Sequence, residues 1–174
     1  MANAGADEAT LVLIKPDAIQ RRQVGLVLER LERLGLELVG AKAMPVSRRL
    51  AEEHYNHLRD KPFFEELLKL LCGELHGVPH VLAFVYAGPD AVARVRQLAG
   101  ATNPDRAEPS SIRGSLGRNM PGGVMENVIH ASSDPQEAER EIMLWFRPEE
   151  LLRPLPWWTK KTASRTTRAR RGGL

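Results

Sequence analysis

Cysteine is almost absent from this sequence, and long apolar runs are missing. Cys72 is the only cysteine in 174 residues, which excludes an intrachain disulfide and any CxxC metal or redox site. A reducing, cytoplasmic setting fits this composition best. No apolar run approaches the roughly 20 residues that a membrane-spanning helix needs, and the polar N-terminus has no secretory signal pattern. We therefore expect a cytoplasmic protein with no membrane partner.

Acidic residues are missing from the last part of the chain. Residues 153–174 hold seven basic residues and no acidic one, which leaves 18 basic against 22 acidic residues in the first 152. The sequence pI of about 9.3 therefore describes a basic tail on a mildly acidic body. We expect a flexible N-terminus (1–9), one domain (10–152) and a disordered basic extension (153–174). The extension is either a plain solubilising tail or a polyanion-binding segment in which Trp157 and Trp158 stack or pack.

Hydrophobic periodicity predicts an alternation of strands and helices without internal repeats. The predicted strands are residues 10–14, 36–44, 80–87 and 124–129. The predicted helices are residues 24–34, two short ones from residues 47 and 62, then 90–100 and 135–145. A Pro- and Ser-rich loop at residues 102–114 lies between the predicted helix 90–100 and the predicted strand 124–129. Loops of that length are usually functional or disordered. This order predicts an α+β, ferredoxin-like βαββαβ fold, with a four-stranded antiparallel sheet and helices on one face.

The stretch ENVIHASSDPQEAEREI raises the question of chemistry. His130 follows an apolar run and begins a turn of small residues. A helix start comes next, with Asp134 as N-cap, Pro135 at the first helical position and Glu137 completing a capping box. A histidine at such a junction can cap the turn, bind a metal or act as a nucleophile. The local sequence leaves these three alternatives open.

Several other polar residues lie at strand ends and loop junctions. Lys15 ends the first predicted strand, Thr102 opens the long loop, Arg113 closes it, and Asn127 precedes the histidine. Arg96 lies on the helix before the loop. Individually these are ordinary surface residues, but together they suit a polyanionic phosphate ligand, for which arginine supplies forked donors and lysine a point charge.

Five segments of the chain resemble nucleoside diphosphate kinases in order and mostly in spacing. They are LIKPDAIQR, EHYNHL with KPFFEEL, GATNPDRAEPSSIRG, NVIHAS and EREIMLWF, and the resemblance covers residues 10–152. It implies transfer of the γ-phosphate of a nucleoside triphosphate to a nucleoside diphosphate, by a ping-pong mechanism through a phosphohistidine at His130. It also implies a homo-oligomer, either a hexamer or a tetramer. The alternative is a catalytically idle nucleotide- or nucleic-acid-binding member of the same fold.

The resemblance also implies a role for each of twelve site residues. Glu141 would orient the imidazole of His130, Ser132 would support Glu141, and Tyr55 would lie beside the reacting histidine. Phe63 would stack on the base, which explains broad base tolerance because every base has a π-face. Lys15 and Asn127 would reach the ribose, Arg96, Thr102 and Arg113 the phosphates, and Leu67 and Val124 would complete an apolar clamp, with ordinary core packing as the competing interpretation of these last two. No metal ligands are predicted, because Mg²⁺ would arrive on the nucleotide phosphates.

The sequence departs from the family pattern in two places. The family string Gly-Ser-Asp after the histidine is replaced by Ala131, Ser132 and Ser133, with Asp134 one place later and still able to cap the helix. The segment between Arg113 and His130 is about four residues longer than in the usual family member. The extra residues, around 119–123, would bulge from the loop, or crowd the nucleotide site if they fold inward. Every chemically essential position is kept, which predicts an active enzyme.

Overall fold

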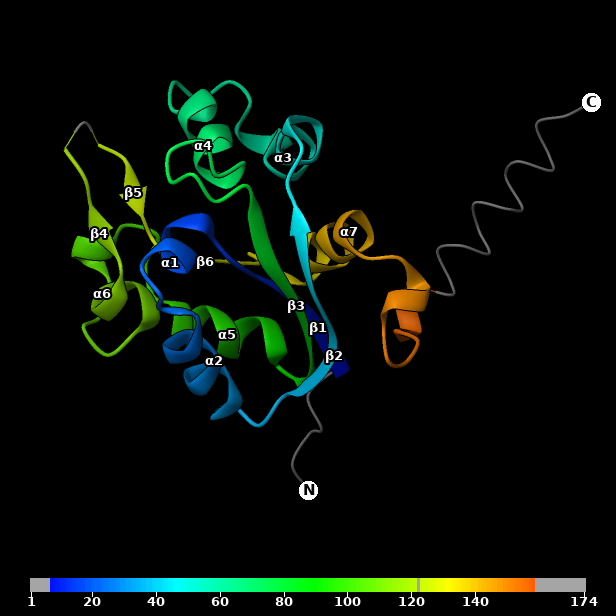
Figure 1. The fold of residues 1–174 in the computed structure, drawn as a ribbon. Helices are drawn as coiled ribbons and strands as arrows, with labels where there is room; N and C mark the ends of the chain where they lie inside the picture. Colours follow the sequence, from blue (N-terminus) through cyan, green and yellow to red (C-terminus); the bar gives the residue numbers. More distant parts are fainter. Residues whose placement is uncertain (1–6, 122, 159–174) are drawn as a thin grey trace, which may run out of the picture.

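The computed structural model describes residues 7–121 and 123–158 (Figure 1). Its centre is a four-stranded antiparallel sheet in the order β2-β3-β1-β6. The strands are β1 (Asp7–Ile14), β2 (Glu37–Pro45), β3 (His80–Pro89) and β6 (Ile129–Ala131). β1 pairs with both β3 and β6, while β2 pairs only with β3 and forms an edge. This order is that of the predicted ferredoxin-like fold, which is confirmed.

Apolar clusters lie on both faces of the sheet, since successive side chains of β1 point to opposite faces. Leu11 and Leu13 of β1 pack in one apolar cluster with helices α3 (Arg48–His54), α4 (Phe64–Leu71) and α7 (Pro135–Trp145). Val12 and Ile14 pack in a second cluster on the other face. That face is covered by α1 (Pro16–Gln20), α2 (Val24–Glu32), α5 (Ala91–Ala99) and α6 (Ile112–Leu116). The expectation of helices on one face was therefore too narrow, since the insertion after β2 and the closing helix cover the second face.

Local sequence signals place several helix ends as predicted. Ser47 caps α3, and its hydroxyl accepts a hydrogen bond from the Leu50 N–H. Gly35 follows α2 with a positive φ of 60°, the conformation that glycine adopts at low cost after a helix. The closing helix α7 begins at Pro135 with Asp134 as N-cap, whose carboxylate accepts from the Glu137 N–H at 2.9 Å. The Glu137 carboxylate bonds Arg140, so the capping box is only half formed.

The predicted strand at residues 124–129 is wrong. Only Ile129 of that run belongs to the main sheet, as the first residue of β6. Residues before it form a separate two-stranded hairpin of β4 (Arg118–Asn119) and β5 (Met125–Glu126). His130 therefore lies inside β6 rather than in the turn after a strand. The run is apolar enough for a strand, but Met125 and Glu126 in its first half pair with Arg118 and Asn119 instead.

The long loop also has more structure than expected. It contains the 3-10 helix η2 (Pro104–Arg106), capped by Asn103, and the helix α6, capped by Ser111. Two further 3-10 helices are η1 (Asn56–Leu58) and η3 (Pro148–Glu150). None of the helices in the described parts of the chain is long and apolar enough to cross a membrane.

The chain folds back against the body after η3. The Leu152 N–H donates to the Val39 carbonyl at 2.8 Å, and Leu155 and Trp158 are buried in the cluster that contains α7. Trp157 packs against the same cluster. The folded part therefore extends past the predicted boundary at residue 152, and both tryptophans serve packing. The remainder of the predicted basic extension lies outside the described residues.

Candidate active site

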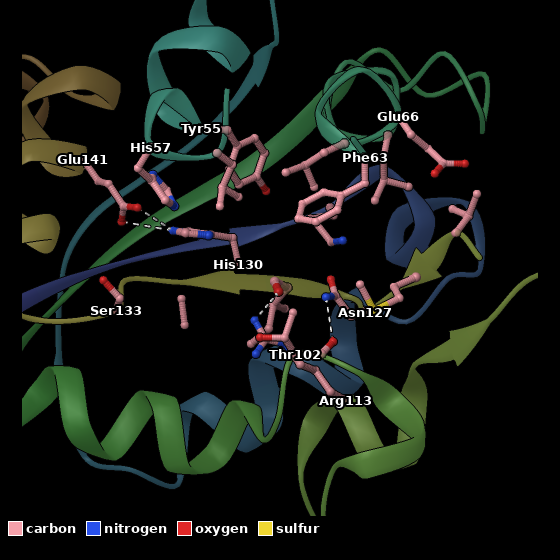
Figure 2. Close-up of a pocket in the computed structure, with 18 of the residues that line it drawn as sticks. Tyr55, His57, Phe63, Glu66, Thr102, Arg113, Asn127, His130, Ser133 and Glu141 are labelled. Carbon is pink, nitrogen blue, oxygen red and sulfur yellow. Dashed lines mark hydrogen bonds and ion pairs between the residues drawn. The ribbon is translucent and has the colours of Figure 1, made fainter. Parts of the chain in front are cut away.

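A cavity of about 390 Å³ opens beside β6 (Figure 2). Eleven of the twelve predicted site residues line it: Lys15, Tyr55, Phe63, Leu67, Arg96, Thr102, Arg113, Val124, Asn127, His130 and Glu141. The twelfth, Ser132, is fully buried behind Glu141. Residues from four separate helices, the hairpin and β6 therefore converge on one space, although they are spread over more than 120 positions of sequence.

The imidazole of His130 is hydrogen-bonded through its Nε2 to Glu141. Its Nε2 lies 2.9 Å from Oε1 and 3.0 Å from Oε2 of Glu141. Glu141 in turn accepts a hydrogen bond from the Ser132 hydroxyl at 2.6 Å. Because a carboxylate can only accept, Nε2 must carry the proton, and Nδ1 keeps its lone pair. The ring is part-buried and lines the cavity, so its free nitrogen is available to a ligand.

Glu141 is a buried carboxylate that stays charged. Burial alone would raise its pKa, but the nearby His130 and the hydrogen bonds from His130 and Ser132 outweigh it and hold the pKa below its ordinary 4.5. A negative charge fixed behind the imidazole favours any state in which that ring becomes positive. This is the arrangement expected of a histidine that forms a covalent intermediate.

His54 lies against His130 and was missed by the sequence reasoning. The two rings meet edge to face, with centroids 4.3 Å apart, and His54 is fully buried. Its Nδ1 accepts a hydrogen bond from the indole N–H of Trp145 at 3.1 Å. Burial, followed by the proximity of His130, lowers the pKa of His54 well below 6.5, so its ring is neutral. Spacing in sequence gave no signal of this contact, which joins α3 to β6 across 76 positions of the chain.

Two buried cations, Arg113 and Lys15, line the cavity. Arg113 donates to the carbonyls of Gly100 at 2.9 Å and Ile129 at 3.0 Å, while its Nε has no partner among the described residues. Burial, and then Arg96, lower the pKa of Arg113 to about 10. Burial likewise lowers the pKa of Lys15, whose Nζ lies 3.8 Å from Asp17. Buried cations without full compensation favour an anionic ligand.

Tyr55 offers a hydroxyl that stays protonated. Its ring is buried with the centroid 6.3 Å from that of His130, and it lines the cavity. Burial, followed by the charge of Glu141, raises its pKa above the ordinary value of 10. The phenol is therefore a neutral donor next to the imidazole.

A strained turn connects the hairpin to β6. Val128 has a φ of 71°, a conformation that β-branched residues rarely adopt, and the Ile129 N–H donates to the Asn127 carbonyl at 2.7 Å across it. The Val128 N–H donates to Asp17 at 2.9 Å, and its carbonyl accepts from the Lys15 N–H at 2.9 Å. These bonds hold the turn. Such strain costs about 1–3 kcal/mol and is common at functional sites.

Asn127 and Thr102 are bonded to each other. The Asn127 side-chain amide donates to the Thr102 carbonyl at 2.9 Å, which ties the rim of the cavity to the loop after α5 (Figure 2). Thr102 and Arg96 are both exposed at this rim. The hydroxyl and the guanidinium therefore remain available for a ligand.

The other end of the cavity is apolar. Phe63 and Leu67 line it from the α4 side, with Leu58 and Leu70 beside them. Gly123, Val124 and Met125 line it from the hairpin, so the inserted residues do fold toward the cavity. Leu67 also packs against the core cluster, as its competing interpretation expected, whereas Phe63 is 47% exposed. Further lining residues not predicted from the sequence are His57, Glu66, Ile129, Ala131, Ser133 and Glu137.

One group of potential metal ligands exists among the described residues. Ligand atoms of His54, His130 and Glu141 lie within 4.8 Å of one another. Imidazole nitrogens suit zinc or copper rather than Mg²⁺, which prefers oxygen ligands. The Glu141 carboxylate is moreover already bonded to His130 and Ser132. This group does not fit a magnesium site.

Comparison with known proteins gives one consistent answer. Residues 8–151 match the family model described as nucleoside diphosphate kinase. The chain is 48% identical over 139 residues to a nucleoside diphosphate kinase from Symbiobacterium thermophilum, which covers 80% of this chain and 87% of that protein. It is 49% identical over 144 residues to the enzyme from Staphylococcus haemolyticus, which covers 83% of this chain and 91% of that protein.

Solved structures agree with the sequence comparison. A nucleoside diphosphate kinase from Halobacterium salinarum in complex with CDP superposes with a TM-score of 0.76 at 42% identity, covering 84% of this chain and 92% of that one. The enzyme from Borrelia burgdorferi, a transition-state mimic with bound vanadate and ADP, superposes with a TM-score of 0.76 at 34% identity. It covers 86% of this chain and 92% of that one.

Proposed function

The chain belongs to the nucleoside diphosphate kinase family, and from this premise we propose that it transfers the γ-phosphate of a nucleoside triphosphate to a nucleoside diphosphate through a phosphohistidine at His130. The observation that supports this mechanism most directly is the Ser132–Glu141–His130 chain. It fixes the proton on Nε2 and leaves the Nδ1 lone pair free at the cavity. Nδ1 is therefore the proposed nucleophile.

In the first half-reaction, the Nδ1 lone pair of His130 attacks the γ-phosphorus of the triphosphate. The new N–P bond forms as the bond from phosphorus to the β,γ-bridging oxygen breaks, and its electron pair leaves with the diphosphate. The imidazole becomes positive, and its Nε2 proton stays hydrogen-bonded to Glu141. The buried carboxylate stabilises this charge at the moment it develops.

In the second half-reaction, a terminal phosphate oxygen of an acceptor diphosphate attacks the same phosphorus. The N–P bond breaks, and its electron pair returns to Nδ1. Donor and acceptor occupy the same cavity in turn, which is the basis of ping-pong kinetics. The relatives that bind CDP or ADP support this use of one site for different nucleotides.

The cations of the cavity would neutralise the phosphates. Arg113 and Arg96 would bind phosphate oxygens with forked donors, Thr102 would add a hydroxyl, and Lys15 and Asn127 would bind at the ribose end. Tyr55 would donate its O–H near the transferring group. Phosphoryl transfer depends mainly on such positioning and charge neutralisation.

Mg²⁺ would enter as part of the substrate. The cavity carboxylates Glu66, Glu137 and Glu141 form no cage of oxygen ligands, since only the His54, His130 and Glu141 atoms cluster among the described residues. Mg²⁺ commonly binds nucleotide phosphates and retains several waters. We therefore propose that the substrate is the Mg²⁺ complex of the triphosphate.

Initial-rate kinetics test the shared site. With ATP and a second diphosphate varied together, the mechanism predicts parallel double-reciprocal lines, because the first product leaves before the acceptor binds. Intersecting lines would indicate a ternary complex and contradict the phosphohistidine route. A chain that binds nucleotides but shows no turnover would support the idle binding module instead.

We further propose a homo-oligomer. β2 is an edge strand of the sheet, and Leu38 on it is 41% exposed, while Leu26 on the adjoining α2 is 54% exposed. An edge strand with exposed leucines beside it is a common interface between identical chains. Light scattering distinguishes a hexamer from a tetramer, and a monomer at working concentration would contradict the proposal.

We propose two further properties of the chain. The basic residues after position 158 would bind a polyanion, and salt-sensitive binding of RNA that truncation of this segment abolishes would support that. A cytoplasmic location is consistent with Cys72, which is a buried free thiol. Fractionation of the source cells tests it.

A further inference from the structure

Asp17 is a buried carboxylate that the proposed chemistry does not use. It lies in the first turn of α1, is fully buried and is not part of the cavity lining. Acidic residues are common in the first turn of a helix, where they interact with the free backbone N–H groups of that turn. The carboxylate of Asp17 instead accepts the backbone N–H of Val128, which lies 111 positions away. Its contacts therefore point to a role outside α1.

The two oxygens of Asp17 face different groups. Oδ2 accepts from the Val128 N–H at 2.9 Å, and this bond fixes the orientation of the carboxylate. Oδ1 has no hydrogen-bond partner among the described residues, and it lies 3.8 Å from the Lys15 ammonium. That distance is too long for a hydrogen bond, so the ion pair uses none of the three N–H donors of Lys15. These donors stay available to a ligand in the cavity.

The bond to Val128 does not by itself require a charged side chain. The oxygen of a neutral amide also accepts a backbone N–H, whereas a buried carboxylate is costly unless an opposite charge compensates it. Lys15 forms that compensating ion pair, and both side chains are almost fully buried. Solvent ions screen a buried pair much less than an exposed one. The charge of Asp17 is therefore explained by Lys15 and not by the turn.

Lys15 needs this compensation while the cavity is empty. Burial lowers the pKa of Lys15, and the charge of Asp17 is the largest influence that opposes it. Arg113 on α6 lowers the pKa further, and Glu126 on β5 raises it by less than Asp17 does. A lysine without its proton would offer no positive charge to an anionic ligand. Asp17 thus preserves the charge that Lys15 presents to the cavity.

We propose that Asp17 is a positioning residue of the nucleotide site, which keeps the Lys15 ammonium charged and in place before the nucleotide binds. This inference rests on the proposed function, because it assumes that a nucleotide occupies the cavity and meets Lys15 at its ribose end. The bond from Val128 orients the carboxylate, and the carboxylate maintains the charge of Lys15. Since Asp17 acts through Lys15, its effect on nucleotide binding disappears when that lysine is replaced.

A double-mutant cycle separates this role from an ordinary contribution to folding. Asp17→Asn removes the charge but keeps an oxygen that can accept from the Val128 N–H. The substitution is made in the wild type and in Lys15→Met. The dissociation constant of Mg·ADP is then measured by calorimetry for all four chains, from about pH 7.5 to about pH 10, the range in which a lysine of lowered pKa titrates.

A matched control and a second assay accompany the cycle. Glu8→Gln is the control, because the Glu8 carboxylate also accepts a backbone N–H, that of Val92, and lies outside the cavity lining. Phosphorylation of His130 by phosphoramidate, a phosphoryl donor without a ribose, is followed by intact mass. It reports on the chemistry at His130 without the contact between Lys15 and a nucleotide.

We expect the Mg·ADP affinity of Asp17→Asn to begin its decline at a pH about one unit lower than in the wild type, since a neighbouring opposite charge raises a lysine pKa by about one unit or more. In Lys15→Met, the same substitution should change the affinity by less than about twofold. The decline near pH 10 that Arg113 causes should be common to all four chains. Phosphorylation by phosphoramidate should match the wild type in Asp17→Asn, and Glu8→Gln should match it in both assays.

Three results would overturn the inference. The same pH dependence in Asp17→Asn and the wild type would show that the carboxylate does not maintain the charge of Lys15. An equally large loss of affinity in the Lys15→Met background would show that Asp17 acts through the fold. A parallel loss of phosphorylation by phosphoramidate would place the effect at His130.

The cycle decides the question even where Asp17→Asn alone does not fold. The chain with both substitutions has no buried charge at either position, and its affinity must then equal that of Lys15→Met. A difference between these two chains would contradict the inference. Failure of the proposed function looks different, because the wild type itself would then bind Mg·ADP but accept no phosphoryl group from Mg·ATP.

Discussion

Replacing Glu141 by glutamine tests the electrostatic core of the account. The carboxylate accepts hydrogen bonds from His130 Nε2 and from the Ser132 hydroxyl, and it is buried. Glutamine has nearly the same shape but no charge. The positive phosphohistidine then donates to a neutral amide instead of a carboxylate. This change costs about 1.5–3 kcal/mol of stabilisation in the transition state. That loss corresponds to a rate of phosphorylation about 10- to 150-fold lower.

A second effect acts in the same direction. The amide N–H₂ of glutamine can donate to Nε2, which would stabilise the tautomer with the proton on Nδ1. The nucleophilic lone pair would then be lost from the cavity side. We therefore expect the loss of phosphorylation rate in Glu141→Gln to lie at the larger end of this range. Nucleotide affinity should change little, because the phosphates are proposed to bind to other residues.

The assay is rapid-quench measurement of His130 phosphorylation by Mg·ATP. Glu139→Gln is the control, since Glu139 lies on the same helix, α7, outside the cavity lining. A folded Glu141→Gln variant that is phosphorylated within about threefold of the wild-type rate would refute the reasoning, because a charge-assisted bond of this kind is worth more than that.

Three further predictions follow from burial and charge. The pKa values of Glu126 and Glu141 lie below 4.5 in the folded chain, so the unfolded chain binds more protons as the pH falls below that value. The free energy of unfolding should therefore fall as the pH drops through the folded pKa values. Urea unfolding at decreasing pH measures this, and an equal loss of stability in Glu126→Gln would contradict it. Trp158→Ala should lower the free energy of unfolding by about 3 kcal/mol, since Trp158 is only 7% exposed, and an unchanged urea midpoint would show that its packing contributes little. Since the pKa of Arg113 is about 10, KM for Mg·ATP should rise as pH approaches that value, and a flat KM profile would argue against phosphate binding by this cation.

The sequence predicts the parts of the fold that local signals determine. The closing helix begins and ends as predicted at Pro135 and Trp145, because proline at the first position and a capping aspartate define its start. The central strand from His80 was predicted from its continuous apolar run, and its side chains are buried on one face and mostly half-buried on the other. Such signals act within a few residues of the element that they define.

Parts that depend on distant contacts could not be read from the sequence. The apolar run before His130 looks like a strand, but its first half pairs with Arg118 and Asn119 in the hairpin instead. The burial of Trp158 results from packing in the cluster that contains α7, which no local pattern of a basic, Pro-containing segment indicates. Coverage of the second sheet face follows in the same way from the insertion after β2.

The candidate site shows the same division. Resemblance supplied twelve residues, and eleven line one cavity with Ser132 directly behind it. His54 and Met125 were missed. His54 contacts His130 only because α3 lies beside β6 in the fold, and Met125 reaches the cavity only because of the inserted hairpin. Residues that act through three-dimensional packing leave no spacing signal in a single sequence.

Intact mass spectrometry of the purified chain tests the central claim most directly. Brief exposure to Mg·ATP should add one phosphoryl group, addition of GDP should remove it, and His130→Ala should never acquire it, while His57→Ala, another cavity histidine, should acquire it. Absence of the adduct in a folded, nucleotide-binding wild type, or its persistence in His130→Ala, would contradict transfer through His130.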